Sequence, residues 1–475
     1  MNNIKMVDSI TSRDENFAKW YTDLCLKAEL MDYSDVQGFI IYRPYGYAIW
    51  ENIQNYLNEK FKETGHQNVY MPMVIPESLF QKEKDHVEGF APETAMITTT
   101  GVEQLAERLI IRPTSEVLFS THYAKIVQSY RDLPKKYNQW CSVVRWEKTT
   151  RPFLRGKEFL WQEGHTIHAT KDEARKETLD MLDIYNNLGS ELLAIPFLTG
   201  RKTEKEKFAG AEETYTIEAL MHDGKALQSG TSHYFGQGFA EAFGIKFQNE
   251  NSKIEFAYQT SWGVSTRLIG AIIMVHGDDE GLVLPPYVAP TQVVIIPIQG
   301  KKEEVINASN DIFKTLKNNK IRVSLDDSNK SPGWKFSEYE MKGVPLRIEV
   351  GPRDLANNTV TIVKRNTREK ISVALENVSG EVDRLLNEIH EEMLAKAKKH
   401  VNEKTNTAKT YDEFKAHLEN GGYVKMSVAG EEAELQIKED TGATARVILK
   451  TELITEVCPV TNKKATQTIM FARAY

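Results

Sequence analysis

Cysteine is scarce in this chain of 475 residues: Cys25, Cys141 and Cys458 are widely scattered and form no CxxC pair. That spacing supports neither a disulfide framework nor a four-thiolate zinc site. Long apolar runs are also missing, since segments such as 293–298 are far shorter than the roughly 20 residues that cross a bilayer. Residues 1–6 do not begin the long apolar segment that a secretory signal peptide contains. We therefore expect a cytoplasmic protein that does not contact a membrane.

The sequence also lacks the phosphate-binding fingerprints GxGxxG and GxxxxGK[ST] in its first 280 residues. A formal net charge of -7 excludes a generally basic, DNA-coating protein, but local Lys and Arg patches can still meet RNA. Strand patterns at 214–221 and 226–235 flank Asp223-Gly224, which is a hairpin signal. Strands joined by short turns favour an antiparallel sheet, whereas a Rossmann domain has a parallel one. If the protein binds a nucleotide, we therefore expect a different kind of nucleotide-binding domain.

Three domains are expected from the length and from the segment 284–290, which holds three prolines and reads as a linker. Beyond it, strand patterns at 292–298, 321–325, 346–350 and 359–363 alternate with helical patterns. That alternation predicts an α/β domain with a largely parallel sheet. We expect an α+β catalytic domain built on an antiparallel sheet over residues 1–284, an α/β domain over 285–398, and a small α+β domain over 399–475.

The most informative stretch is 142–170, where two predicted strands flank a charged loop. Arg145 and Glu147 share one face of the first strand, because side chains two apart point the same way. The second strand gathers two aromatics, a carboxylate and an imidazole on one face: Phe159, Trp161, Glu163 and His165. A single such pair is also explained by a solvated sheet edge. The same spacing recurs in two other places, at Thr114 and Glu116 and at Thr231 and His233.

This set of side chains suits an amino acid and a polyphosphate. Glu116 and Glu163 can hold an ammonium, and Phe159 can stack on a purine. Arginine binds carboxylate and phosphate groups in bidentate fashion. The candidates for that role are Arg145, Arg155 and Arg267, the last in the first turns of an apolar helix. Attack of a carboxylate on an α-phosphorus needs positioning and charge stabilisation, and no Ser/His/Asp or Cys/His triad is evident. Adenylation therefore fits better than hydrolysis.

At these residues the chain resembles the class II aminoacyl-tRNA synthetases. Arg145-x-Glu147 followed by Arg155-Gly-Lys-Glu-Phe159 is similar to motif 2, and 263–270 with Arg267 is similar to motif 3. Residues 43–72 resemble motif 1, the dimer-interface element of the class. Within the class, Arg112-Pro-Thr-Ser-Glu116, Trp161-Gln-Glu-Gly-His165 and Gln228-Ser-Gly-Thr-Ser-His233 are similar to the prolyl-tRNA synthetases. The resemblance covers nearly the whole chain.

The resemblance implies a homodimer that uses ATP with Mg²⁺, L-proline and tRNA(Pro), with Arg145 and Arg267 in catalytic roles. The residues that it places around proline are Thr114, Glu116, Arg145, Trp161, Glu163, His165 and His233. Those that it places around ATP are Arg145, Glu147, Arg155, Phe159, Gln228, Thr231 and Arg267. The sequence identifies no protein ligand for magnesium.

The α/β domain resembles the anticodon-binding domain of this family. On its strand at 346–350, Arg347 and Glu349 project away from the apolar side. Arg and Glu can pair with the edges of unstacked bases, which is how RNA loops are commonly read. The candidates for contacts with the anticodon are Arg347, Glu349, Arg353 and Lys364. Surface salt bridges between these side chains are the alternative reading.

The sequence departs from the family in its last domain, where many relatives bind zinc through four cysteines. Ala429, Ala433 and Thr461 stand where three of them are expected, which leaves Cys458 alone. One thiolate cannot hold a structural zinc, so we expect a domain that folds on its apolar core. Residues 170–260 are also too few for the large editing domain of the longer bacterial type. These features resemble the short type shared by archaea, eukaryotes and some bacteria.

Three other functions remain to be weighed. A synthetase-like protein that binds RNA without activating an amino acid would keep the fold, but such proteins usually lose the motif arginines. A threonine, glycine or histidine enzyme would share the class; the threonine enzyme needs zinc ligands in its pocket, and no matching Cys/His set is evident. An unrelated kinase or ligase would need a phosphate loop.

Overall fold

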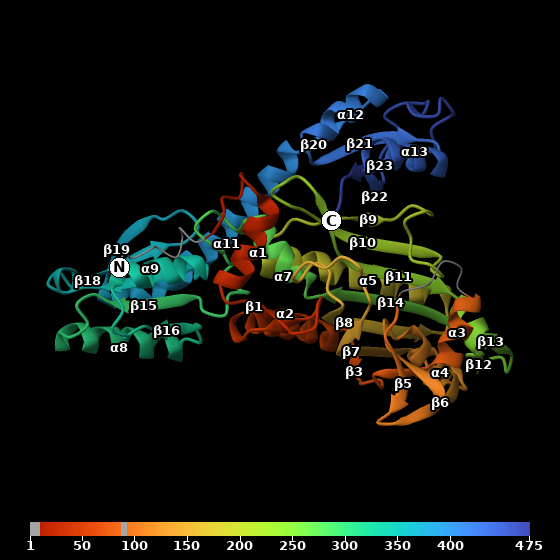
Figure 1. Cartoon of the computed structure of the whole chain (residues 1–475), viewed down its shortest axis with the longest axis horizontal. Coiled ribbons are helices and arrows are strands. Elements are labelled where there is room, and N and C mark those ends of the chain that lie inside the picture. Colours follow the sequence, from red (N-terminus) through yellow and green to blue (C-terminus); the bar gives the residue numbers. More distant parts are fainter. Residues whose placement is uncertain (1–9, 87–92) are drawn as a thin grey trace.

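The computed structural model describes residues 10–86 and 93–475, so the segment 1–6 discussed above lies outside the described residues. Figure 1 shows an elongated molecule with the large catalytic sheet on one side, the α/β domain on the other, and the last domain above the sheet. Within the described ranges, no helix combines the length and the apolar character needed to span a membrane.

The catalytic domain is organised around an antiparallel sheet, as predicted. Its strands run in the spatial order β9-β10-β11-β14-β8-β7, with the short β3 added in parallel at the outer edge. Their bounds are β3 Gln67–Asn68, β7 Lys135–Val144, β8 Glu158–His168, β9 Leu198–Arg201, β10 Glu213–Leu220, β11 Ala226–Gly236 and β14 Tyr258–Ser265. The hairpin predicted around Asp223-Gly224 is confirmed as β10 and β11.

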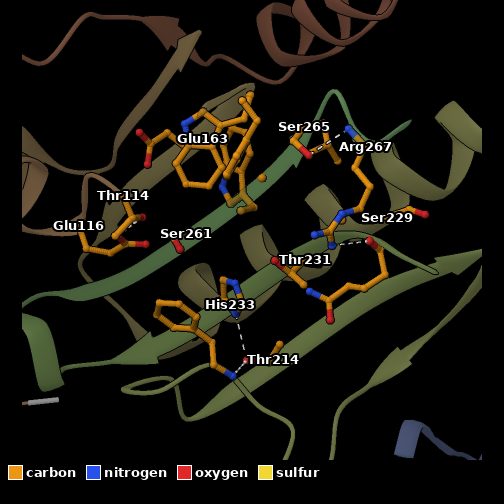
Figure 2. Close-up of a pocket in the computed structure, with 18 of the residues that line it drawn as sticks. Thr114, Glu116, Glu163, Thr214, Ser229, Thr231, His233, Ser261, Ser265 and Arg267 are labelled. Atoms are coloured by element: carbon orange, nitrogen blue, oxygen red, sulfur yellow. Dashed lines mark hydrogen bonds between the residues drawn. The ribbon is translucent and has the colours of Figure 1, made fainter. Parts of the chain in front are cut away.

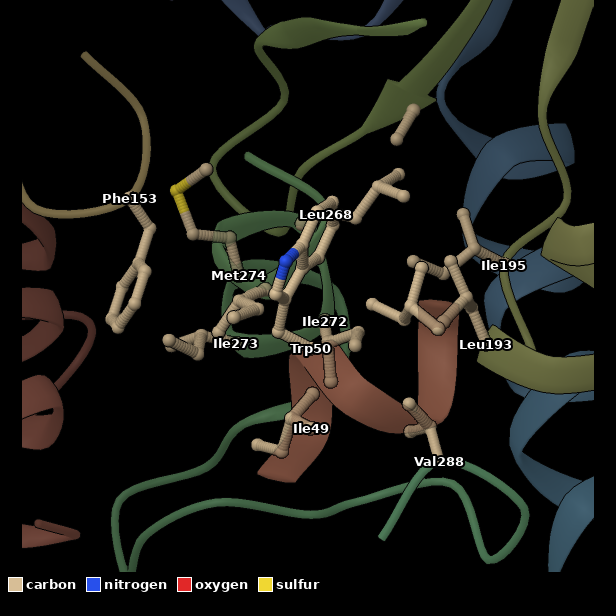
Figure 3. Close-up of a cluster of buried hydrophobic side chains, with 14 of the residues drawn as sticks. Ile49, Trp50, Phe153, Leu193, Ile195, Leu268, Ile272, Ile273, Met274 and Val288 are labelled. Carbon is tan, nitrogen blue, oxygen red and sulfur yellow. The ribbon is translucent and has the colours of Figure 1, made fainter. Parts of the chain in front are cut away.

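Four helices contribute to the main core with the sheet: α1 Phe17–Lys27, α2 Pro44–Glu63, α5 Lys171–Leu188 and α7 Arg267–His276. Figure 3 shows Ile49 and Trp50 of α2 packed against Leu268 and Ile272 of α7. Pro44 suits the first position of α2 because its missing N–H would have no helical partner there. Thr170 begins α5 with a capping box, in which its hydroxyl and the Glu173 carboxylate satisfy reciprocal backbone N–H groups.

A second hydrophobic core packs against the sheet next to the motif at 112–116. It packs around α4 Glu116–Ile126 and α6 Gly238–Phe243. Smaller elements surround it: β1 Met31–Tyr33, β2 Ile40–Tyr42, β4 Val74–Pro76, α3 Glu77–His86, β5 Met96–Thr100, β6 Glu103–Ile111, β12 Lys246–Gln248 and β13 Ile254–Phe256. This arrangement places the N-terminus of α4 beside the middle of β8.

The α/β domain has the predicted elements, but its sheet is mixed rather than largely parallel. The order is β16-β15-β17-β18-β19; β15 runs parallel to both neighbours, and β17, β18 and β19 are antiparallel. The bounds are β15 Val293–Pro297, α8 Glu303–Asn318, β16 Val323–Leu325, α9 Pro332–Met341, β17 Leu346–Val350, α10 Pro352–Leu355, β18 Thr359–Lys364 and β19 Lys370–Ala374. The strand β19 was missed, and short loops make its hairpin with β18 antiparallel.

Helix α11, Val378–Glu403, runs through the predicted boundary at 398/399 and leads into the last domain. The linker at 284–290 is packed rather than loose: Val288 and Ala289 are fully buried, and the Arg322 guanidinium donates to the carbonyls of Pro286, Tyr287 and Ala289. The interdomain angle is therefore held by buried contacts.

The last domain continues the catalytic sheet. Its strands lie in the order β20-β21-β23-β22, and β22 joins β9 through the pair Ile448 and Arg201. The elements are β20 Thr405–Thr407, α12 Tyr411–Glu419, β21 Tyr423–Val428, α13 Glu431–Thr441, β22 Thr444–Leu449 and β23 Gln467–Ala472. A hydrophobic cluster that includes Phe414, Val424, Ile437 and Phe471 forms its core.

Candidate active site

Register across the sheet brings the predicted side chains into two rows. In one row Glu163 on β8 is opposite Gly263 on β14, which is opposite Thr231 on β11. In the next row His165 and His233 lie on either side of Ser261. Glycine and serine on the central strand leave open the space that larger side chains would fill. The cavity is therefore a consequence of small residues at every second position of β14.

The cavity has a volume of about 280 Å³, and all of the predicted substrate residues except Glu147 and Arg155 line it. Thr114 and Glu116 lie at one end and Arg267 at the other, with Thr231 and His233 between them (Figure 2). Residues outside the predicted motifs also line it, namely Lys202, Glu206, Phe208, Thr214, Ser261 and Trp262.

Glu163 is the most heavily bonded group in the cavity. Its Oε1 accepts hydrogen bonds from Ser115 Oγ at 2.5 Å and Gln139 Nε2 at 2.7 Å, and its Oε2 lies 2.9 Å from Nε2 of His165. Burial by itself would raise the pKa of Glu163, but the His165 imidazole and the hydrogen bonds from Ser115 and Gln139 outweigh it and lower the pKa. Glu163 is therefore a fixed negative charge at the cavity wall.

An aromatic and cationic wall faces this carboxylate. The Arg145 guanidinium lies 5.4 Å from the ring centre of Phe159 and 5.5 Å from that of Trp161, within the range of cation–π attraction. Its Nε donates to the carbonyl of Pro113 at 2.9 Å. Burial lowers the pKa of Arg145, and the nearby Glu116, Glu163 and Glu147 carboxylates oppose that shift. Gly164 is required beside this wall because a Cβ there would meet the Trp262 ring at 2.2 Å.

Arg267 closes the other end. It is the first residue of α7, as the sequence predicted, and its side chain donates to the carbonyls of Leu154 at 3.0 Å and Gln228 at 3.1 Å. Burial, followed by the charges of Arg145 and Arg155, lowers the pKa of Arg267 to about 10. Arg145 and Arg267 line this cavity and Arg155 lines the neighbouring one, and this concentration of positive charge favours the binding of a multiply charged anion.

His233 sits deep in the cavity as a neutral imidazole. Its Nδ1 lies 3.0 Å from the hydroxyl of Thr214, and the Phe208 ring is 4.7 Å away. Burial, together with the Lys202 and His165 charges, lowers the pKa of His233 to about 3. The inner part of the cavity therefore combines an apolar ring, a neutral imidazole and hydroxyl groups.

Several predicted placements are corrected by the structure. β7 ends at Val144, so Arg145 and Glu147 follow the strand rather than lying on it. Glu116 begins α4, and the hydroxyl of Thr114 reaches it by a turn, donating to its carboxylate. Arg155 lines a neighbouring cavity that shares Phe159, and Glu147 lines neither of the two. The reason is a turn after Val144: two-residue periodicity holds only inside a strand.

Ser261, Gly263 and Ser265 could have been found from the sequence, because small residues at a spacing of two begin just before the third motif and continue into it. Lys202 gave no such signal, since it lies in a loop just after β9. Glu218, on β10, is fully buried and ion-paired.

The four anticodon candidates differ in accessibility. Arg347 is ion-paired with Glu340 at 3.0 Å and Glu349 at 2.9 Å. Lys364 is buried and pairs with Glu388 at 2.7 Å and Glu392 at 2.8 Å. Arg353 is exposed on α10. Intramolecular pairing therefore accounts for three of the four side chains, and base contacts by these residues stay a prediction.

Comparison with known families agrees with this geometry. An antiparallel sheet whose cavity is lined by residues of the second and third motif regions defines the catalytic core of a class II aminoacyl-tRNA synthetase, and residues 99–276 match the family model "tRNA synthetase class II core domain (G, H, P, S and T)". Residues 292–385 match "Anticodon binding domain", and residues 411–475 match "Prolyl-tRNA synthetase, C-terminal".

The chain belongs to the prolyl-tRNA synthetase family. It is 62% identical to a proline–tRNA ligase of Phytoplasma australiense over 100% of both chains, and 60% identical to one of Clostridium novyi (strain NT) over 99% of both. A prolyl-tRNA synthetase structure from Cryptosporidium parvum superposes with a TM-score of 0.95 at 40% identity, covering 99% of this chain and 100% of that one. The chain is an ATP-dependent ligase that activates proline and attaches it to tRNA(Pro), which decides against the threonine, glycine and histidine alternatives and against a non-activating protein.

Proposed function

We propose that the cavity between β8, β14 and β11 is where proline and ATP react. The observation that carries the proposal is the joint placement of Glu163, Trp161 and Arg145 around one space. A buried carboxylate suits the secondary ammonium of proline, and an aromatic wall suits its flat pyrrolidine ring. Thr114, Glu116, His165 and His233 complete the proline end.

ATP occupies the other end in this proposal. Phe159 and Arg267 take the adenine between them, Gln228 and Thr231 contribute polar contacts, and Arg155 and Glu147 act from the rim. Arg155 and Glu147 both influence the pKa of Arg267, which supports their nearness to that guanidinium. The Cryptosporidium parvum relative is described in complex with halofuginone and AMPPNP, and this supports a nucleotide site in the present chain.

The reaction follows from this placement. A carboxylate oxygen of proline attacks the α-phosphorus of ATP, pyrophosphate leaves, and Arg145 and Arg267 stabilise the negative charge that develops. The 3′-terminal hydroxyl of tRNA then attacks the carbonyl carbon of the adenylate and AMP leaves. The protein supplies orientation and electrostatic stabilisation in both steps.

Magnesium accompanies ATP. Among the described residues there is no cluster of three or more His, Cys, Asp and Glu side chains arranged to hold a metal ion. That is compatible with Mg²⁺, which usually keeps several waters and binds through substrate phosphates with few protein ligands. In the last domain, Cys458 interacts with the backbone of Thr461, Val460 and Ala429. These contacts support a domain that needs no structural zinc.

The homodimer is proposed from the surface beside motif 1. Large apolar side chains are exposed there, among them Tyr70 at 66%, Met73 at 47% and Ile41 at 54%. Tyr70 and Met73 are three residues apart in the chain, and exposed apolar side chains that cluster on a surface mark an interaction site. The Arg112 guanidinium lies 5.2 Å from the Tyr70 ring centre and is two residues from Thr114, so this surface is continuous with the proline end of the cavity.

The short type and a cytoplasmic location are also proposed. Between β8 and β14, within the described residues, the chain forms only α5, α6, a single turn of π-helix and β9 to β13, and this supports the absence of an inserted editing domain. Such an enzyme relies on its pocket to reject alanine, which lacks two ring carbons. A missing methylene discriminates by only about 1–3 kcal/mol.

The test is ATP–pyrophosphate exchange across all twenty amino acids. We expect exchange with proline that is lost in Arg145→Ala, with Arg384→Ala, an exposed arginine on α11, as a matched control that retains it. If Arg145→Ala exchanged as well as the unaltered enzyme, the proposed reaction site would be wrong.

A further inference from the structure

One buried carboxylate beneath the cavity is shared by two cations from different domains. Glu218, on β10, is fully buried. Its Oε2 accepts hydrogen bonds from Arg446 Nε at 3.1 Å and Nη2 at 2.7 Å. Its Oε1 lies 3.5 Å from Nζ of Lys202 and accepts a hydrogen bond from the Thr216 hydroxyl at 3.0 Å. Because Arg446 belongs to β22, this network ties the last domain to the catalytic sheet.

A sheet irregularity directs Arg446 toward Glu218. The register between β22 and β23 shifts between Ala445 and Val447, which leaves Arg446 without an opposite residue. A second shift, between β10 and β11, leaves Ser229 of β11 unpaired next to the pair of Glu218 and Gln228. A bulge inserts an unpaired residue and redirects its side chain, and bulges are common beside active sites. The presentation of Arg446 is therefore built into the backbone of β22.

Lys202 connects this ion-pair network to the cavity. It lines the cavity, and its side chain is 4% exposed. Burial lowers the pKa of Lys202, and the Glu218 carboxylate opposes that shift. Across the part of the chain that the structure describes, Glu218 is its one partner within ion-pair distance. Glu206 adds a negative charge at the cavity wall but lies beyond that distance.

The balance of charge in the network favours an anion. Glu218 is committed to Arg446 by two hydrogen bonds, so its longer contact with Lys202 neutralises that ammonium only in part. Within this network, two cations and one carboxylate leave one net positive charge, and Glu206 lies beyond ion-pair distance of Lys202. A substrate phosphate that reached Lys202 would complete the ion pairing of its ammonium group. Such charge-assisted hydrogen bonds are stronger than hydrogen bonds between neutral groups.

A second contact holds the same segment. The hydroxyl of Thr203 donates to the Glu434 carboxylate of α13 at 2.7 Å, and both residues are buried. The backbone N–H of Lys202 donates to the carbonyl of Thr214 at 2.8 Å. The last domain thus contacts this part of the catalytic domain through two side chains, Glu434 at Thr203 and Arg446 at Glu218, and only Arg446 belongs to the charge network that includes Lys202.

We propose that Lys202 contacts a substrate phosphate and that Arg446 is a positioning residue for this contact: by occupying Glu218 it leaves the Lys202 ammonium available. The proposal rests on the proposed reaction site. The phosphate belongs either to ATP in the activation step or to the 3′ end of tRNA in the transfer step, and the chemistry of recognition is the same for both.

The net charge of Lys202, Glu218 and Arg446 in each variant distinguishes this role from a purely structural one. In Arg446→Met, Glu218 turns to Lys202 alone and the net charge falls to zero. Lys202→Met removes the charge directly. In the double variant Glu218→Gln/Arg446→Met, Lys202 has no carboxylate partner and the single positive charge returns. Glu434→Ala is the matched control, because it removes the other buried contact between the same two domains and leaves the three charges unchanged.

The experiment measures the KM for ATP and for proline in pyrophosphate exchange, the single-turnover transfer of proline from the preformed adenylate to tRNA(Pro), and Tm for each full-length variant. We expect Lys202→Met and Arg446→Met to raise the KM for ATP by about tenfold, as the loss of one charged contact predicts, with the KM for proline unchanged. The double variant should return to within about twofold of the unaltered enzyme. Glu434→Ala should lower Tm and leave the KM for ATP unchanged.

Normal exchange with slow transfer in Lys202→Met and Arg446→Met, restored in the double variant, would also support the proposal and assign the phosphate to tRNA. The proposal is overturned if neither step changes in Lys202→Met, if the double variant fails to recover, or if Glu434→Ala shifts the KM for ATP as far as Arg446→Met. If Arg446→Met does not fold because Glu218 is left unbalanced, Lys202→Met and the double variant still decide. Loss of exchange in Arg145→Ala, measured alongside, tests the reaction site separately.

Discussion

Nε1 of Trp161 donates a hydrogen bond to Sγ of Cys141, 3.2 Å away at the directly opposite position on the neighbouring strand. The indole is thereby fixed against the Arg145 guanidinium on its other side. Burial, followed by the charge of Glu163, raises the pKa of Cys141 to about 12, so the sulfur stays protonated and neutral. A cysteine that the sequence marks only as isolated therefore orients the proposed wall of the proline site.

Cys141→Ala should weaken proline binding by about three- to tenfold, because one hydrogen bond that orients the indole is lost. The KM for proline should rise while kcat and the KM for ATP stay unchanged, as measured by pyrophosphate exchange. Cys141→Ser keeps an acceptor at the same position and should stay close to the unaltered enzyme. Equal KM values for the alanine variant and the unaltered enzyme would show that the thiol does not orient Trp161.

Glu163→Gln should raise the KM for proline by roughly a hundredfold, since a hydrogen bond to a charged group contributes about 1.5–3 kcal/mol. The amide keeps the size of the side chain, so the change tests the charge. Ser115→Ala removes one of the hydrogen bonds that hold the carboxylate and should cost less than Glu163→Gln. A proline KM that stays unchanged in Glu163→Gln, measured by the same exchange assay, would contradict a carboxylate–ammonium contact.

The stability of the protein should fall on acidification, and His168 contributes to this change. It is buried and lies 2.8 Å from the hydroxyl of Thr166. Burial, only partly offset by the Glu177 carboxylate, lowers the pKa of His168 from 6.5 to about 4. Between these two values the unfolded chain binds a proton that the folded protein does not, so the free energy of unfolding decreases as the pH falls, by at most about 1.4 kcal/mol per pH unit.

Tm measured across that interval checks this linkage. His168→Gln cannot take up a proton in the unfolded state, so its Tm should depend less steeply on pH than that of the unaltered protein. His122→Gln, at a half-buried site on α4, is the comparison variant. Parallel Tm curves for His168→Gln and the unaltered protein would exclude His168 as a source of the acid sensitivity.

Tyr70→Asp combined with Met73→Asp should weaken the proposed homodimer. Burying two carboxylates against apolar surface is costly unless they find partners, so the dimer should dissociate at concentrations where the unaltered protein stays associated. Sedimentation velocity over a concentration series measures the shift. Val102→Asp, at a 97% exposed position in the turn after β5, should leave the association unchanged. A monomeric unaltered protein at all concentrations would contradict the dimer itself.

Arg353→Ala and Lys364→Met should separate RNA contact from folding in the anticodon-binding domain. Arg353 is exposed, so its loss should reduce charging of tRNA(Pro) by about tenfold and leave pyrophosphate exchange unchanged. Lys364 is buried between Glu388 and Glu392, so its loss should lower Tm. Steady-state aminoacylation and thermal unfolding of both variants provide the readouts. Unchanged charging in Arg353→Ala would remove this residue from the anticodon contacts.

The amino-acid sequence by itself determined those features that depend on neighbours a few residues apart. The alternation of Phe159, Trp161, Glu163 and His165 placed them on one face of β8, and turn residues located the hairpin of β10 and β11. The three motifs identified the class of the catalytic core. Strand periodicity, turn chemistry and helix starts act locally, so they are legible in a linear sequence.

The tertiary structure alone decided which segments meet. Gly263 opens the cavity only because register sets it between Glu163 and Thr231, and Arg446 reaches Glu218 across 228 positions of the chain. The mixed sheet of the anticodon-binding domain and the joining of β22 to β9 are further choices of strand partner. Pairing and domain docking are set by burial and charge compensation summed over distant residues, and no local pattern carries that information.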